Sequence, residues 1–223
     1  MKNIGPLPLY ILVAVLCSHQ AISQSMFQKV IGGTAGNEIA SHAQMTSDSG
    51  QIIVGYTQSF STGNADIYLV KLDAAGNLEW NKTYGGADDE VGYDVQPTSD
   101  NGYIVIGEIL HGVGQGDKDI LLIKTDSVGD TLWTNTYGGP DTDVGYSVKQ
   151  TFDGGYILVG YTLSYGTGGA DSYVIKTDAL GDTTWTRTYS TGYHDFSYWI
   201  IQTADSGYIF TGETEYITAD NAF

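Results

Sequence analysis

Residues 145–189 read GYSVKQTFDGGYILVGYTLSYGTGGADSYVIKTDALGDTTWTRTY, and this stretch decides the fold. It divides into four short runs rich in β-branched and aromatic residues, at 145–151, 156–162, 172–177 and 183–189, separated by Gly- and Asp-rich segments. Such runs between turn residues are typical of antiparallel strands. Apolar residues do not recur every 3.6 positions over any sustained stretch of residues 24–223, so we expect almost no helix.

The same pattern recurs along most of the chain. Three tryptophans stand about 53 residues apart, with Phe27 at the matching place before them, and a glycine recurs in each Asp-x-Gly turn. These recurring residues are Trp80, Trp133 and Trp185, and Gly50, Gly102, Gly155 and Gly207. Four antiparallel strands in a repeat of about 50 residues match one blade of a β-propeller. The repeats cover approximately residues 39–84, 92–137, 145–189 and, in part, 197–223.

These repeats predict an all-β fold, a β-propeller of four-stranded antiparallel blades that is incomplete, with about three and a half blades present. A β-sandwich is the alternative, but it does not require Trp and Gly at fixed positions in every repeat. Residues 27–33 (FQKVIGG) match the end of a fourth strand, so we expect them to close a blade. We expect the chain to be a fragment of a longer protein or a truncated copy, or, as an alternative, to pair with a second chain.

The first 23 residues are typical of a secretory signal peptide. Lys2 supplies a positive charge, residues 9–16 (LYILVAVL) form an apolar run, and residues 21–23 (AIS) form a small-residue cleavage site. The run is much shorter than the roughly 20 residues that span a membrane, so no membrane span is expected. Lipidation at Cys17 is an alternative, although Leu16 fits a lipidation signal poorly. Residues 24–223 are therefore predicted to form one repeat region, secreted or on the outer cell surface.

Charge and composition exclude several classes of function. With 9 Lys+Arg against 26 Asp+Glu, the chain has a formal net charge of −17, which argues against nucleic acid as a partner. After residue 23 there is no cysteine, so packing and strand pairing alone would stabilise the fold. The three histidines of this part, His42, His111 and His194, are scattered, and no Gly-x-Ser-x-Gly motif is present. No catalytic residues are therefore predicted.

One aromatic residue departs from the repeat. The recurring tryptophans and glycines are explained by packing and turn formation, which every repeat requires. Trp199, in contrast, matches Asp94 and Ser147 in the preceding repeats, so the fold does not demand an aromatic side chain there. Trp199 is the strongest single candidate for a ligand contact.

Carboxylates gather in the loops that a propeller would place on one face. Asp66, Asp119 and Asp171 end one loop type and are candidate metal ligands. The loops between repeats hold further ligand-binding candidates, namely Asp88, Asp89, Glu90, Asp141 and Asp143. Ca²⁺ prefers oxygen ligands of this kind, although the spacing matches no EF-hand loop. The alternatives are a Ca²⁺ site and a solvated acidic rim, and no other cofactor is expected.

Two segments carry a resemblance to a known family. KTDSVGDTLWTNTYGG (124–139) and FDGGYILVGYT (152–162) resemble the tandem β-propeller repeats of secreted Bacteroidota proteins. The turn with Asp126, Gly129 and Trp133 is also similar to the Trp-docking turn of quinoprotein-type propellers, with one residue fewer. The resemblance implies the fold and export, in many such proteins by type IX secretion, and it implies no quinone cofactor.

The sequence therefore predicts a secreted or cell-surface propeller that acts as a non-catalytic module for binding or display. Its partner would be a polysaccharide or another surface protein. Two alternatives remain open: part of a polysaccharide-active hydrolase of endoglucanase type, and a passive spacer between other domains. An enzyme needs non-repeating acids facing one cleft. A binding module needs non-repeating aromatic residues or metal ligands, and a spacer needs neither.

Overall fold

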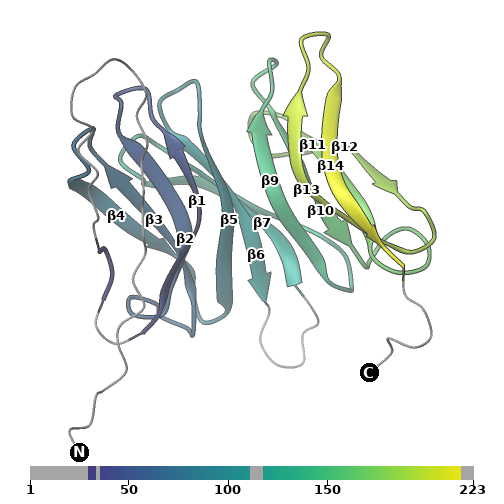
Figure 1. The fold of residues 1–223 in the computed structure, drawn as a ribbon, viewed down its shortest axis with the longest axis horizontal. Helices are drawn as coiled ribbons and strands as arrows, with labels where there is room; N and C mark the ends of the chain where they lie inside the picture. The colour runs from purple at the N-terminus through teal and green to yellow at the C-terminus, as the bar shows by residue number, and fades with distance from the viewer. Residues whose placement is uncertain (1–29, 34–35, 111–117, 217–223) are drawn as a thin grey trace, which may run out of the picture.

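The computed structural model describes residues 30–33, 36–110 and 118–216, and within them the chain is all β. Fourteen antiparallel strands form four sheets, and no helix occurs in these residues (Figure 1). The first sheet contains β1 (Glu38–Met45), β2 (Gln51–Thr57), β3 (Asp66–Leu72) and β4 (Leu78–Tyr84). The second contains β5 (Asp89–Pro97), β6 (Tyr103–Leu110), β7 (Lys118–Thr125) and β8 (Thr131–Tyr137). The third contains β9 (Asp143–Gln150), β10 (Tyr156–Thr162), β11 (Asp171–Thr177) and β12 (Thr183–Tyr189), and the fourth β13 (His194–Gln202) and β14 (Tyr208–Glu215).

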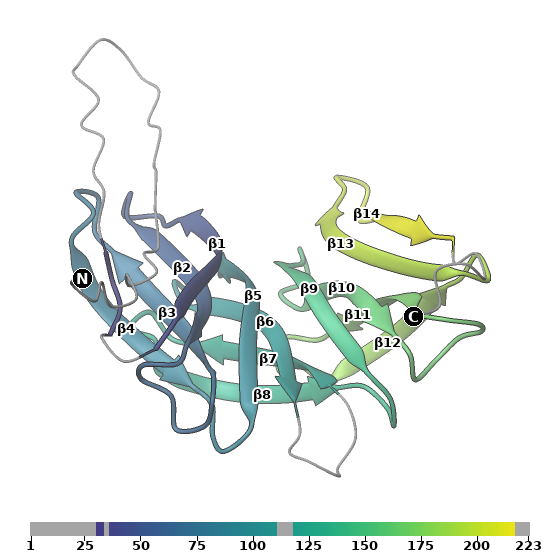
Figure 2. The same ribbon diagram turned by 60° about the horizontal axis from the view of Figure 1, so that its bottom comes forward.

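Strand order follows the sequence in every sheet. Within a sheet, each strand pairs with the next one along the chain. The first strands of successive sheets lie beside one another, β1 with β5, β5 with β9, and β9 with β13. Figure 2 shows the sheets following one another along a curve, with these first strands on its inner side. The prediction of antiparallel sheets, four-stranded in three repeats, is confirmed, and closure into a ring stays a prediction.

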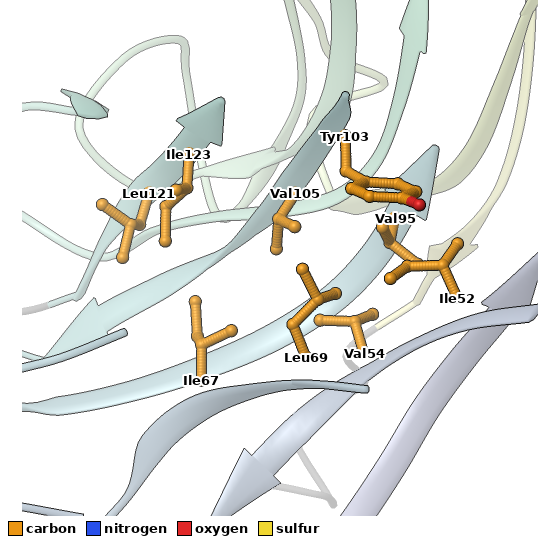
Figure 3. Packing of buried hydrophobic residues seen from close by; sticks show 9 residues of the cluster. All are labelled: Ile52, Val54, Ile67, Leu69, Val95, Tyr103, Val105, Leu121 and Ile123. Atoms are coloured by element: carbon orange, nitrogen blue, oxygen red, sulfur yellow. The ribbon is translucent and has the colours of Figure 1, made fainter. Parts of the chain in front are cut away.

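The core lies between the sheets. The second and third strands of the first three sheets are buried along almost their whole length. Neighbouring sheets cover both faces of the second and third sheets, whereas Ile31 packs on the outer face of the first. Figure 3 shows one cluster, in which Ile52, Val54, Ile67 and Leu69 of the first sheet meet side chains of the second. Those partners are Val95, Tyr103, Val105, Leu121 and Ile123.

Alternation along each strand gives a sheet two packing faces. In β6, Val105 faces the first sheet, whereas Ile104 and Ile106 pack against Val148 and Leu158 of the third sheet. Each sheet of the repeat is therefore built to be covered on both sides.

The fourth strands and the following turns connect neighbouring sheets. The Trp80 ring lies 5.8 Å from the Tyr103 ring, and a Cβ on Gly129 would come within 2.9 Å of the indole. The adjacent Tyr84 donates its hydroxyl to Gly129 O at 2.7 Å. Gly129 has φ +82°, which a residue with a side chain adopts only at a cost. The equivalent contacts recur between Trp133 and Tyr156, at 5.8 Å, and between Trp185 and Tyr208, at 6.0 Å.

The Asp-x-Gly turns form one unit with a buried lysine on the third strand. Lys71 is 3% exposed, and its Nζ lies 2.8 Å from Asp48 Oδ2 and 3.0 Å from Leu72 O. A side chain on Gly50 would collide with both the ammonium and that carbonyl oxygen. Lys124 with Asp100 and Lys176 with Asp153 repeat the arrangement, at 2.9 Å each.

Candidate functional site

Matching positions of the four first strands hold four different residues. His42 in β1, Asp94 in β5, Ser147 in β9 and Trp199 in β13 occupy the same place in the repeat. Because the first strands lie side by side, these residues come together on the inner side of the curve. Lys149, two positions after Ser147, joins them. We call His42, Asp94, Ser147, Lys149 and Trp199 the first-strand cluster.

Asp94 is the centre of this cluster and is 1% exposed. Its Oδ2 accepts hydrogen bonds from the Val148 amide at 3.1 Å, Ser147 Oγ at 3.2 Å and Lys149 Nζ at 3.3 Å. Its Oδ1 lies 2.5 Å from His42 Nδ1. One carboxylate therefore links the first strands of three sheets.

Trp199 attaches the fourth sheet to the same cluster. The Lys149 ammonium lies 3.8 Å from the centre of the indole, within the range of a cation–π interaction. The His42 ring meets the indole edge to face, with 5.7 Å between ring centres. Trp199 still exposes 39% of its surface. Part of its ring is therefore accessible to a ligand, while polar side chains hold the rest in place.

Burial and charge act in opposite directions on the two ionisable groups at the centre. Burial favours the neutral acid, but His42, Lys149 and the Val148 amide outweigh it and hold the pKa of Asp94 below its ordinary value. Burial lowers the pKa of Lys149, and the attraction of Asp94 offsets only part of that effect. The carboxylate is therefore ionised at neutral pH and fully engaged with its neighbours.

The geometry of the first-strand cluster does not match that of a nucleophilic triad. Acyl transfer requires a histidine between the serine and the carboxylate, so that the serine gives its proton to the imidazole. Here Ser147 Oγ donates to Asp94, and His42 approaches the opposite oxygen of the same carboxylate. Asp94 is also occupied by five partners, because Gln96 Nε2 donates to its Oδ1 at 3.3 Å. The arrangement orients His42, Lys149 and Trp199 rather than activating Ser147.

A second group of aromatic residues follows the same strands. Tyr93, Tyr146 and Tyr198 each precede a member of the first-strand cluster by one position. The Tyr146 ring lies 5.1 Å from Tyr93 and 5.3 Å from Tyr198, and Tyr161 lies 6.0 Å from it. Burial, followed by the charge of Glu108, raises the pKa of Tyr93. These phenols are neutral hydrogen-bonding groups at any physiological pH.

The carboxylates predicted as metal ligands lie at the junctions between sheets. Asp66 begins β3 of the first sheet, and Glu90 lies in β5 of the second; both approach the space beside Gly85. Asp119 and Asp143 approach Gly138 in the same way at the next junction. Burial, opposed in part by the Gly86 amide, raises the pKa of Glu90 to about 7, and the charge of Asp66 adds to the effect.

The other loop carboxylates take part in loop contacts. Asp89 Oδ1 accepts hydrogen bonds from the Asn64 and Ala65 amides at 3.2 Å each. The Asp141 amide donates to Ser164 Oγ at 3.0 Å. The Asp88 backbone oxygen lies close to Gly63. These three acids connect neighbouring loops, whereas Trp199 belongs to the first-strand cluster, so the structure divides the predicted ligand residues between two places.

Sequence reasoning identified Trp199 but missed His42 and Lys149 as its neighbours. The signal was present at the matched position, where His42, Asp94, Ser147 and Trp199 share no chemistry although the surrounding residues recur. In the described part of the chain, no three or more His, Cys, Asp or Glu side chains are grouped to hold a metal ion. A helix long and apolar enough to cross the bilayer is likewise not found among these residues.

Comparison with known proteins assigns no function to the chain, so its function must be argued from the geometry of the site. No protein-family model matches the chain. No curated protein matches its sequence significantly.

Proposed function

We propose that this chain is a secreted or cell-surface, non-catalytic module of propeller type that binds a polysaccharide through the first-strand cluster. The observation that carries this proposal is the position of Trp199, an exposed indole at a place where the repeat requires no aromatic residue. Lys149 and His42 fix its orientation. A preoriented aromatic ring loses little conformational entropy when a ligand stacks on it.

Three features support a sugar as the ligand. The apolar face of a pyranose packs on an indole, and its hydroxyl groups need donors and acceptors beside the ring. Lys149 and His42 supply polar groups at that place, and Tyr198, 42% exposed, lies on the same strand. The net charge of −17 opposes the approach of an anionic polymer. We therefore propose a neutral polysaccharide as the ligand.

Several observations support the propeller arrangement. The sheets succeed one another with their first strands inward, and each carries the same Trp and Tyr contacts to the next. Closure by residues 27–33 remains part of the proposal, since residues 27–29 lie outside the described residues. Residues 1–23, on which export depends, also lie outside them.

The test is binding of a soluble neutral β-glucan, followed by tryptophan fluorescence and by affinity electrophoresis. Trp199→Ala is expected to weaken binding at least tenfold, because a Trp at the centre of an interface contributes about 2 kcal/mol or more. Phe152→Ala is the control, since Phe152 is an exposed aromatic residue in a turn of the third sheet, 72% exposed.

The same samples separate the alternatives. Equal binding by Trp199→Ala and the unchanged chain would overturn the role of Trp199. Release of reducing sugars would indicate a hydrolase, and tighter binding of polygalacturonate than of the neutral polymer would contradict the electrostatic argument. A chain that binds no polymer would be a spacer.

A further inference from the structure

Buried carboxylates recur at the junctions between sheets, apart from the first-strand cluster. Asp66, Asp119 and Asp171 lie at or near the start of the third strands, and Glu90, Asp143 and Asp195 lie at or near the start of the first strand of the following sheet. We call these six residues the junction carboxylates. Glu90 is 3% exposed and Asp66 is 2% exposed, and Asp143 and Asp171 are fully buried.

Three of these six side chains use one oxygen to hold their own loop. Asp66 Oδ2 accepts from the Thr62 amide at 3.0 Å, Asp143 Oδ2 from the Gly139 amide at 2.8 Å, and Asp171 Oδ2 from the Thr167 amide at 2.7 Å. The second oxygen of each, Oδ1, is buried and has no hydrogen-bond partner. A buried acceptor without a partner costs free energy, so each of these oxygens requires an explanation.

The two carboxylates of a junction point at a common space. At Gly85, a Cβ would overlap Glu90 Oε2 and lie 2.6 Å from Asp66 Oδ1. At Gly138, it would overlap Asp119 Oδ1 and lie 2.8 Å from Asp143 Oδ2, which already accepts hydrogen bonds from the Gly139 amide and from Ser164 Oγ at 2.6 Å. At Gly85, in contrast, the Asp66 oxygen that faces the second acid is the buried Oδ1 without a hydrogen-bond partner.

Lysine and arginine do not balance the charge of the two acids beside Gly85. No ion pair among the described residues involves Asp66, Glu90, Asp143 or Asp171. Two carboxylates close together in a dry environment repel each other strongly. A cation between them would remove the repulsion and give the unused oxygens a partner.

We propose that the junction beside Gly85 binds a Ca²⁺ ion, with Asp66 and Glu90 as carboxylate ligands. Both side-chain donors are oxygen, which suits a hard cation. Ca²⁺ accepts six to eight oxygens in irregular geometry, whereas Mg²⁺ requires a near-ideal octahedron. A pair of carboxylates near the starts of two strands, completed by backbone carbonyls and water, favours Ca²⁺.

The third junction differs and provides an internal control. Ser190 takes the place of the glycine. Both oxygens of Asp195 are already engaged, Oδ2 by the Thr191 amide at 2.7 Å and Oδ1 by Thr214 Oγ1 at 2.6 Å. Both oxygens of Asp195 are therefore occupied, and the third junction should bind no Ca²⁺. One Ca²⁺ ion is expected in the described residues, beside Gly85.

The experiment uses residues 24–223 after treatment with a chelator. Calorimetric titration with Ca²⁺ is expected to give one site, and Tb³⁺ is expected to show emission sensitised by nearby tyrosine. Glu90→Gln should remove this site. Asp130→Asn, in an exposed turn, lowers the negative charge equally and should leave the site intact.

Thermal unfolding gives a second measurement. Ca²⁺ that binds only the folded state must raise the midpoint, by an amount that grows with concentration above the dissociation constant. The same concentration of Mg²⁺ should raise it much less. The proposal is overturned if Ca²⁺ gives no heat and Tb³⁺ no emission, if Asp130→Asn reduces the response as much as Glu90→Gln, or if Mg²⁺ matches Ca²⁺.

Discussion

Lys149 Nζ lies 3.8 Å above the Trp199 ring, so the third sheet holds the indole of the fourth. The same ammonium is 3.3 Å from Asp94 Oδ2 in the second sheet. Asp94 in turn reaches His42 in the first. A short series of contacts thus connects the inner strands of all four sheets. A ligand that stacks on Trp199 would bind at one end of this series.

Asp94→Ala is expected to destabilise the protein by about 3 kcal/mol, because it leaves the partly buried Lys149 without its charge partner. Ser147→Ala removes a single hydrogen bond to the same carboxylate, so its cost should be about 2 kcal/mol. Urea unfolding followed by fluorescence measures both. If the two variants lost equal stability, the charge of Asp94 would contribute nothing beyond the one hydrogen bond.

A glycine of the second strand marks a close approach of two backbones. A Cβ on Gly160 would overlap Val144 O, and the backbone there cannot move without breaking the pairing of β9 and β10. Gly160→Ala should therefore cost about 3 kcal/mol. Gly86→Ala is the matched control, since its Cβ would meet nothing within 4 Å, and the change should stay within about 0.5 kcal/mol.

How far sequence predicts this structure depends on the kind of residue. Trp80, Gly50 and Lys71 serve the repeat itself, so their recurrence reveals the strand order and the turns. The spatial grouping of His42, Asp94, Ser147 and Trp199 depends instead on four strands from four sheets. None of these four residues is unusual within its own strand, and only the inner position of the first strands brings them together. The residues that recur therefore predict the sheets and turns, whereas the position at which the repeat is interrupted indicates the candidate site.

The junction carboxylates show which part of the structure the sequence does not predict. The sequence predicts Asp66 and Asp119 as metal ligands and Glu90 and Asp143 as ligand-binding residues, but it does not predict that Glu90 faces Asp66 or that Asp143 faces Asp119. Pairing across a junction depends on the angle between sheets, which a repeat period does not determine. The Gly85 and Gly138 positions carried the relevant signal, because a turn alone does not require the absence of a Cβ there.

Stability should fall in acid because the Asp-x-Gly turns depend on ionised carboxylates. Hydrogen bonds from Thr151 and Lys176 lower the pKa of Asp153 to about 2. A lowered pKa contributes stability that is present above the ordinary value of 3.8 and is lost as the pH falls through the folded-state value. The thermal midpoint should therefore drop between about pH 4 and pH 2.

Asp153→Asn should reduce the fall of the thermal midpoint in acid more than Asp205→Asn does. Asp205 occupies the matching turn of the fourth sheet, where Thr203 and Gly207 lower its pKa without a lysine partner. Calorimetric scans of both variants between pH 2 and pH 5 provide the comparison. Equal effects would show that the Thr and backbone hydrogen bonds, rather than Lys176, determine the acid response.

The two tyrosine hydroxyl hydrogen bonds between sheets should contribute equally to stability and independently of each other. Tyr84 donates to Gly129 O at 2.7 Å and Tyr137 to Gly181 O at 2.6 Å, each bridging one sheet to the turn of the next. Replacing either tyrosine by phenylalanine leaves the ring in place and removes the hydrogen bond, so each change should cost about 1 kcal/mol. The two bonds share no partner, so the double variant should lose about 2 kcal/mol.

Tyr189→Phe is the matched control for these variants. Tyr189 holds the same position in the third sheet but is 44% exposed, and its hydroxyl makes no hydrogen bond within the described part of the chain. Its replacement should change the free energy of unfolding by less than about 0.5 kcal/mol. A loss at Tyr189 as large as that at Tyr84 would mean that the ring substitution itself, rather than the bond between sheets, causes the effect.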